Sequence, residues 1–221
     1  MRDRRAASGG GIMLAAALTV FLSHGAAQNT KATLTTLYSF NLAAGSGYPG
    51  DDVVIGSGGV LYGVTADGGT GGFGTAFALT PPAAPDGAWT ELVLHNFAGG
   101  SDGKSPGGLT IGDAGVLYGT TYYGGNSGCS TDGAPGGCGT VFSLAPPASP
   151  GGIWTYTVLY RFTGGTDGSA PQARLAIDAS GVLYGVSSAV SYLPIVFALS
   201  PPSSPGGGVV RADDLSIHAR R

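Results

Sequence analysis

Charged side chains are scarce in this chain. Of its 221 residues, 13 are Asp or Glu and 10 are Lys or Arg, which gives a net charge of −3. Intrinsic disorder requires low hydrophobicity and high net charge, whereas 43% of these residues are hydrophobic. A surplus of basic residues is also lacking, which argues against nucleic acid and anionic membrane surfaces as partners. The composition therefore favours a folded chain that does not bind polyanions.

The N-terminal hydrophobic run is too short to cross a bilayer. It covers Ile12–Leu22, about half of the ~20 residues that a spanning helix needs. A basic start (MRDRR) precedes the run and small residues follow it, which is the pattern of a secretory signal peptide. We therefore expect residues 1–27 to be a signal peptide cleaved after Ala27, and the rest to be exported, either extracellular or at the cell surface. An uncleaved membrane anchor is the alternative.

Glycine and proline, in contrast, are abundant, with 42 and 14 residues. Together they make up about a quarter of the chain, a level otherwise typical of low-complexity sequence. Each glycine inside a helix costs ~1 kcal/mol relative to alanine, so long helices are excluded. The glycines must lie in turns, and many turns with few charges favour an all-β fold.

Three phrases recur in the same order, which makes the chain a repeat protein. They are Leu-x-x-Phe, Gly-Val-Leu-Tyr-Gly and Phe-x-Leu-x-Pro-Pro. Their positions are 37–40, 94–97 and 159–162; 59–63, 115–119 and 181–185; and 77–82, 142–147 and 197–202. The phrases predict one domain over 28–208 with repeats at about 33–89, 90–154 and 155–208. The pattern is lost in the tail, 209–221, which suggests that the repeat array is truncated.

Four short strands are expected in each repeat. The segment Thr155–Phe162 is rich in Thr, Tyr and Val and is bounded by Pro and Gly. Further strands are expected at Leu109–Ile111, Val116–Thr121 and Thr140–Leu144, and the third repeat matches the first of these at Leu175–Ile177. Four antiparallel strands in each repeat of about 40–60 residues are typical of a β-propeller blade. A closed propeller needs at least about four blades, so three four-stranded blades predict an incomplete or open propeller.

The second repeat carries a family resemblance. It reads Gly115-Val-Leu-Tyr-Gly-Thr-Thr-Tyr-Tyr-Gly-Gly125, then Gly139-Thr-Val-Phe142, after Phe97-Ala-Gly-Gly-Ser-Asp-Gly103. These residues resemble the bacterial GloVer (Gloeo/Verruco) repeat of choice-of-anchor surface proteins, and the resemblance covers residues 33–202. It implies an exported protein of the cell surface and no particular reaction.

The two cysteines, Cys129 and Cys138, both lie in an insertion of the second repeat, Gly125–Gly139. An exported chain reaches an oxidising compartment, so we expect a disulfide that staples this loop. Zinc would need two further ligands, and the neighbouring sequence has no other His or Cys. Free thiols are the alternative.

Acid–base residues form no catalytic pattern. His95 occupies the place that Tyr38 and Tyr160 hold in the other repeats, so it is interpreted as an aromatic position in a strand. Asp102 and Asp167 lie in matched Asp-Gly dipeptides, which favour turns. A calcium loop needs several carboxylates, whereas the second and third repeats supply one each here and the first has Gly45 instead. We therefore predict no catalytic residue, no cofactor and no metal.

The tyrosines are better candidates for binding, because an aromatic face gives a large contact area at little entropic cost. Those of the Leu-Tyr-Gly phrases are expected to pack between blades: Tyr62, Tyr118 and Tyr184. Tyr122 and Tyr123 begin the inserted loop and, with Asn126, form the candidate binding loop. Its expected partner is an extracellular protein or a carbohydrate.

The leading hypothesis is an exported bacterial surface protein that acts as a non-catalytic binding or structural module. The alternative is a propeller enzyme, a lyase or glycosidase, with carboxylates that converge on a central channel. Two carboxylates from different blades within about 5–10 Å of each other would indicate that alternative. Scattered positions on outer turns for Asp51, Asp52, Asp113 and Asp178 would argue against it.

Overall fold

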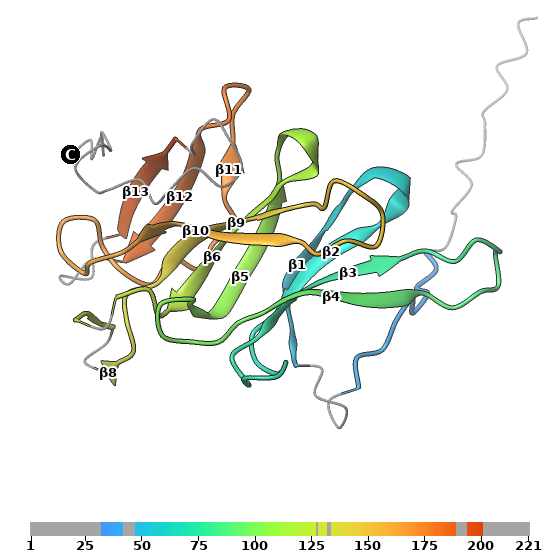
Figure 1. The fold of residues 1–221 in the computed structure, drawn as a ribbon, viewed down its shortest axis with the longest axis horizontal. Coiled ribbons are helices and arrows are strands. Elements are labelled where there is room, and N and C mark those ends of the chain that lie inside the picture. Colours follow the sequence, from blue (N-terminus) through green and yellow to red (C-terminus); the bar gives the residue numbers. More distant parts are fainter. Residues whose placement is uncertain (1–31, 42–46, 127, 132–133, 189–193, 201–221) are drawn as a thin grey trace, which may run out of the picture. The chain divides into compact units, whose positions relative to one another are not determined.

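The computed structural model describes residues 32–41, 47–126, 128–131, 134–188 and 194–200. By its internal contacts the chain divides into residues 1–35 and 36–221, and all strands lie in the second unit. These strands pair in antiparallel fashion within three open sheets and one short hairpin (Figure 1). The predicted all-β fold is confirmed. The predicted signal peptide and tail lie outside the described residues.

Two of the sheets have four strands, each joined to the next along the chain. The first contains β1 (Pro49–Ile55), β2 (Leu61–Thr65), β3 (Thr75–Thr80) and β4 (Thr90–Asn96). The second contains β5 (Lys104–Ile111), β6 (Leu117–Tyr123), β9 (Thr140–Ala145) and β10 (Thr155–Arg161). The 3₁₀ turns η2 (Ser57–Gly59) and η3 (Asp113–Gly115) precede β2 and β6.

The third sheet has three strands within the described residues: β11 (Ala176–Ile177), β12 (Leu183–Ser188) and β13 (Pro194–Leu199). The remaining two, β7 (Ser130–Thr131) and β8 (Ala134–Pro135), form a hairpin in the inserted loop. The prediction of four strands therefore holds for two sheets. An outer strand that followed β13 along the chain would fall among residues 201–221, which are not described.

The sheets are displaced by one strand from the sequence repeats. The strand expected to open the third repeat, Thr155–Phe162, pairs instead with β9 of the preceding sheet. The strand at the start of the second repeat does the same, because β4 pairs with β3. The Leu-x-x-Phe phrases of the second and third repeats therefore supply the outer strand of the sheet before them. The assignment of that strand to its own repeat's sheet is corrected accordingly.

The glycine of each Leu-Tyr-Gly phrase makes room for an aromatic ring on the neighbouring strand. The pairs are Gly63–Phe77, Gly119–Phe142 and Gly185–Phe197. A Cβ atom on Gly63 or on Gly119 would lie 2.6 Å from the ring opposite it, which real side chains do not allow. The Gly-Val-Leu-Tyr-Gly and Phe-x-Leu-x-Pro-Pro phrases thus share the same Gly–Phe contact in each sheet.

Two hydrophobic clusters join the sheets. One combines residues of the first and second sheets, such as Val64 and Leu109, and the other joins the second and third sheets. The phenylalanine that ends each Leu-x-x-Phe phrase packs on the buried phenylalanine of the next sheet. The centroid distances are 5.0 Å for Phe40–Phe77, 5.3 Å for Phe97–Phe142 and 5.2 Å for Phe162–Phe197.

Within the described residues, no helix has the length and apolar character to cross a membrane.

Candidate functional site

A cavity of about 370 Å³ lies where residues of all three repeats meet. We call it the first-strand cavity, because its wall comes mainly from β1, β5 and the segment before β11. The side chains that matter for binding are Asp52, Tyr122, Gln172 and Arg174, and Pro49 and Pro106 occupy matched positions beside them. The sequence repeats had suggested no pocket at these positions.

Two side chains of opposite charge meet at this cavity. Arg174 Nε lies 3.4 Å from Asp52 Oδ2, and both side chains are partly exposed. A Cβ atom at Gly108 would lie 2.6 Å from Asp52 Oδ1 and 3.1 Å from the Cβ of Arg174, so this glycine leaves space for the pair. Within the described chain, Asp52 Oδ1 is buried and accepts no hydrogen bond. The first and third repeats thus contribute one anionic and one cationic group across a glycine of the second.

The three residues of the candidate binding loop lie in different surroundings. Tyr122 is half-buried and lines the first-strand cavity. Tyr123 is also half-buried; its ring lies 4.3 Å from that of Tyr122 and 4.7 Å from Lys104 Nζ. Asn126 is exposed and lines a second cavity of about 510 Å³, beside Phe73. The Asn126 carboxamide oxygen accepts a hydrogen bond from the Gly128 N–H at 3.0 Å.

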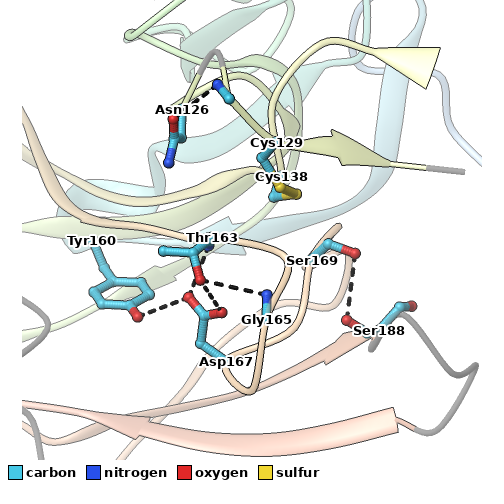
Figure 2. Close-up of a disulfide and its surroundings, with 10 residues drawn as sticks. Asn126, Cys129, Cys138, Tyr160, Thr163, Gly165, Asp167, Ser169 and Ser188 are labelled. Atoms are coloured by element: carbon cyan, nitrogen blue, oxygen red, sulfur yellow. Dashed lines mark hydrogen bonds between the residues drawn. A yellow bond between two sulfur atoms is a disulfide. The ribbon is translucent and has the colours of Figure 1, made fainter. Parts of the chain in front are cut away.

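The inserted loop is tied to the third repeat (Figure 2). Cys129 and Cys138 are buried and lie at disulfide distance, with Cα atoms 5.5 Å apart. A Cβ atom at Gly164 would lie within 2.9 Å of both sulfur atoms. The Ala170 N–H also donates a hydrogen bond of 2.8 Å to the Cys138 carbonyl. The base of this loop is therefore part of the core between two sheets.

Asp167 organises the turn beneath that loop (Figure 2). Its carboxylate accepts hydrogen bonds from the Thr163 N–H at 2.8 Å, the Thr163 hydroxyl at 2.6 Å and the Tyr160 hydroxyl at 2.9 Å. Gly168 follows with a φ of +78°, which favours glycine. Burial, followed by the hydrogen bond to Asp167, raises the pKa of the Tyr160 hydroxyl. The interpretation of this Asp-Gly dipeptide as a turn is confirmed.

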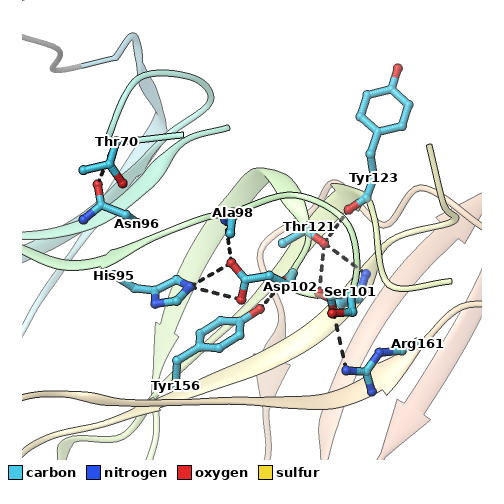
Figure 3. Close-up of polar contacts among 11 residues, drawn as sticks. Thr70, His95, Asn96, Ala98, Ser101, Asp102, Thr121, Tyr123, Tyr156 and Arg161 are labelled. Carbon is cyan, nitrogen blue, oxygen red and sulfur yellow. Dashed lines mark hydrogen bonds and ion pairs between the residues drawn. The ribbon is translucent and has the colours of Figure 1, made fainter. Parts of the chain in front are cut away.

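Asp102 has the matched role in the second repeat (Figure 3). It accepts a hydrogen bond from the Ala98 N–H at 2.7 Å, and His95 Nε2 lies 3.1 Å from the same oxygen. The imidazole stacks on Tyr156 at 3.9 Å and meets Phe97 edge to face at 4.9 Å. Burial, with the charge of Asp102, raises the pKa of the Tyr156 hydroxyl. His95 therefore fills an aromatic position, as the sequence predicted.

The acidic residues that the enzyme hypothesis requires lie in different places. Asp113 is in η3, and Asp178 is in the turn between β11 and β12. The Asp178 carboxylate accepts hydrogen bonds from Ser180 N, Val182 N and the Tyr184 hydroxyl at 2.8, 3.0 and 2.9 Å. Asp52 is at the first-strand cavity, and the side chain of Asp51 is not described. Within the described residues, no group of three or more His, Cys, Asp or Glu is placed to hold a metal ion.

The Leu-Tyr-Gly tyrosines behave as expected in two repeats. Tyr62 packs in the cluster between the first two sheets, 5.8 Å from Trp154. Tyr118 packs in the next cluster, together with Ile177. Tyr184, on the third sheet, is 39% exposed. Packing between sheets is thus confirmed for the first two tyrosines only.

Sequence reasoning found Tyr122 but missed Asp52, Gly108 and Arg174 as neighbours. The matched prolines of the first strands were the available signal, because equivalent positions of stacked repeats come together in space.

Comparison with known proteins agrees with the pattern of phrases. No curated protein sequence matches the chain. The family model described as the Gloeobacter/Verrucomicrobia repeat matches residues 25–193, which is most of the chain and includes every residue of the first-strand cavity. The chain belongs to the Gloeobacter/Verrucomicrobia repeat family.

Proposed function

We propose that this chain is an exported protein of the bacterial cell surface and acts as a non-catalytic binding module. The observation that carries the proposal is the first-strand cavity, to which all three repeats contribute. Its volume of about 370 Å³ is in the range of about 300–1,000 Å³ that small-molecule sites occupy. A cavity of this kind supports binding over a purely structural spacer.

The groups around the cavity suit a polyhydroxylated ligand. Tyr122 offers an aromatic ring, Gln172 an amide that both donates and accepts hydrogen bonds, and Asp52 with Arg174 an acceptor beside a donor. Neither sign of charge is in excess there. A neutral carbohydrate, or the end of a longer glycan, therefore fits this lining better than a charged ligand.

Binding without catalysis is supported by the surroundings of Asp52. Glycoside hydrolysis uses two carboxyl groups about 5–10 Å apart, one as acid and one as base or nucleophile. Among the described residues that line the cavity, Asp52 is the single acid, and Arg174 pairs with it. This arrangement can orient a hydroxyl group but offers no second carboxylate.

A glycan array followed by calorimetry tests the proposal. The full chain is screened first, and the glycan that it retains is titrated against Tyr122→Ala and Arg174→Gln. Each substitution should weaken binding at least ~10-fold, equivalent to ~1.4 kcal/mol. Tyr184→Ala and Arg161→Gln, at residues that do not line the cavity, are the matched controls and should bind nearly as the unaltered chain does.

Three results would contradict the proposal. The first is that the array retains no glycan. The second is that both controls lose affinity as strongly as the cavity variants. The third is turnover of the retained glycan, which would favour the enzyme alternative.

A further inference from the structure

Among the described residues, no strand pairs with the outer edge of the third sheet. In the first two sheets, β3 and β9 are covered by the outer strands β4 and β10. In the described chain, β13 is the matching strand; it pairs with β12 on one side, and no described strand pairs with its other side. Val196 lies one residue before the phenylalanine of its strand and is 64% exposed, whereas Ala76 and Val141 at the matched positions are fully buried. The third sheet therefore exposes the residue at a position that the first two sheets bury under an outer strand.

The chain also carries an outer-strand sequence that pairs with no strand in the described structure. Residues 33–40 read TLTTLYSF and residues 155–162 read TYTVLYRF, which agree at both Thr and at Leu, Tyr and Phe. The second of these segments contains β10, whereas the described residues 36–41 form no strand. Leu37 is 47% exposed, although Leu159 at the matched position is buried.

This segment already makes the contact that an outer strand makes with the next sheet. Phe40 packs on Phe77 as Phe97 and Phe162 pack on their own partners. The Tyr38 hydroxyl also donates a hydrogen bond of 2.7 Å to Glu91 of β4. Residues 36–40 are thus held against the first sheet, in the place of an outer strand that belongs to a preceding sheet.

The first and third sheets each carry one exposed side chain of a pair that packs together between neighbouring sheets. At both internal junctions, the Leu-Tyr-Gly tyrosine of one sheet and the isoleucine that ends the first strand of the next sheet pack in one cluster. The pairs are Tyr62–Ile111 and Tyr118–Ile177. The unmatched members are Tyr184, which is 39% exposed, and Ile55, which is 72% exposed. A further junction of the same kind would bring these two together.

We propose that the partner is a second copy of this chain. The segment 33–39 of each copy pairs with β13 of the other, and Tyr184 of each packs on Ile55 of the other. The described chain supplies three sheets, so two copies supply six, which lies within the range of about four to eight blades of closed propellers. Two head-to-tail copies therefore close a ring of six four-stranded sheets and cover both open edges.

The register of the new pairing follows from the two existing outer strands. Phe77 and Phe142 lie opposite Val93 and Val158, and Ala76 and Val141 lie opposite His95 and Tyr160. The matched partners in the dimer are Phe197–Thr36 and Val196–Tyr38. The bulge between the two pairs falls at Leu37, as it falls at Leu94 and Leu159.

The first test is the mass of the full chain in solution, measured by light scattering after size-exclusion chromatography. The expected mass is twice the 21.7 kDa of one chain. Val196→Lys places a charge under the added strand and should halve the measured mass. Ile153→Lys, at a residue that is 90% exposed and outside the proposed interface, should leave the mass unchanged.

The second test is a cross-link. The double variant Ile55→Cys, Tyr184→Cys should form a covalent dimer under mild oxidation, whereas Ile153→Cys, Tyr184→Cys should not. A mass of one chain would overturn the proposal and would agree with coverage of β13 by residues 201–221 of the same chain. A trimer, a higher assembly, or a dimer that withstands Val196→Lys and forms no Ile55–Tyr184 cross-link would also overturn it.

Discussion

His95 and Tyr160 make the same contact at matched positions, although their side chains differ. Each side chain is hydrogen-bonded to the aspartate seven residues later, Asp102 or Asp167. Each also lies edge to face with the phenylalanine two residues on. The position therefore requires a flat ring with a polar end, and an imidazole meets this requirement as well as a phenol does.

We expect His95→Tyr to keep the free energy of unfolding within about 1 kcal/mol, because the phenol can still reach the turn aspartate. His95→Ala removes the stacked ring and the hydrogen bond and should cost about 1–3 kcal/mol. Urea denaturation of the two variants measures the difference. Equal losses in both would show that the position needs an imidazole, contrary to this interpretation.

The buried tyrosines predict a loss of stability at alkaline pH. The pKa values of Tyr156 and Tyr160 are raised above the ordinary 10.0, mainly by burial. When the pKa of a tyrosine is higher in the folded state than in the unfolded state, the folded protein keeps its full stability below the unfolded-state pKa. It loses stability as the pH rises above that pKa. The free energy of unfolding should thus fall as the pH rises past the ordinary tyrosine pKa of 10.0.

Urea denaturation at these pH values measures that decline. Tyr160→Phe should reduce it, whereas Tyr48→Phe, at an exposed residue, should not. If the free energy of unfolding of Tyr160→Phe declined as much as that of the unaltered chain, the loss would not be due to Tyr160.

At the scale of elements, the inserted loop depends on its two cysteines. A disulfide that closes a short loop contributes about 2–3 kcal/mol by restricting the unfolded chain. We expect intact-mass measurement to find Cys129 and Cys138 oxidised and the double Ser variant to unfold at a lower urea concentration. A reductant should destabilise the unaltered chain but should leave the stability of the double Ser variant unchanged. Free thiols in the chain purified from an oxidising compartment would contradict the bond.

The Gly–Phe contact at the centre of each sheet predicts a second effect at this scale. Gly119→Ala places a methyl group 2.6 Å from the Phe142 ring. Overpacking of this kind costs about 1–3 kcal/mol. Gly128→Ala, whose new Cβ would meet no atom closer than 3.5 Å, is the control. If urea midpoints fell equally in both, the ring contact would not be the reason for this glycine.

At the scale of the whole molecule, export is the property that the N-terminal segment predicts. A bacterial host that makes the full chain should release it from the cytoplasm with Gln28 as the first residue, because the small residues before this point suit signal peptidase. N-terminal sequencing checks the cleavage site, and Ala27→Lys should block it. Retention of the intact N-terminus by the unaltered chain would favour the membrane anchor.

The sequence by itself determined the all-β class, the family and most strands. The physical reason is that these properties are local and repeated. Glycine excludes long helices, Thr, Tyr and Val favour strands, and a phrase that occurs three times marks a contact made three times. The Asp-Gly turns and the aromatic place of His95 were predictable for the same reason, since both recur at matched positions and their hydrogen bonds to the turn aspartate span seven residues.

Only the tertiary structure decided which strand belongs to which sheet and which side chains surround the cavity. A Leu-x-x-Phe phrase has the same composition whether it pairs forward or backward, and hydrogen bonds of β10 to β9 settle the choice. Asp52 and Arg174 meet because the first and third repeats approach each other past Gly108. Such contacts between distant residues depend on how the sheets pack, and no local pattern in the sequence encodes them.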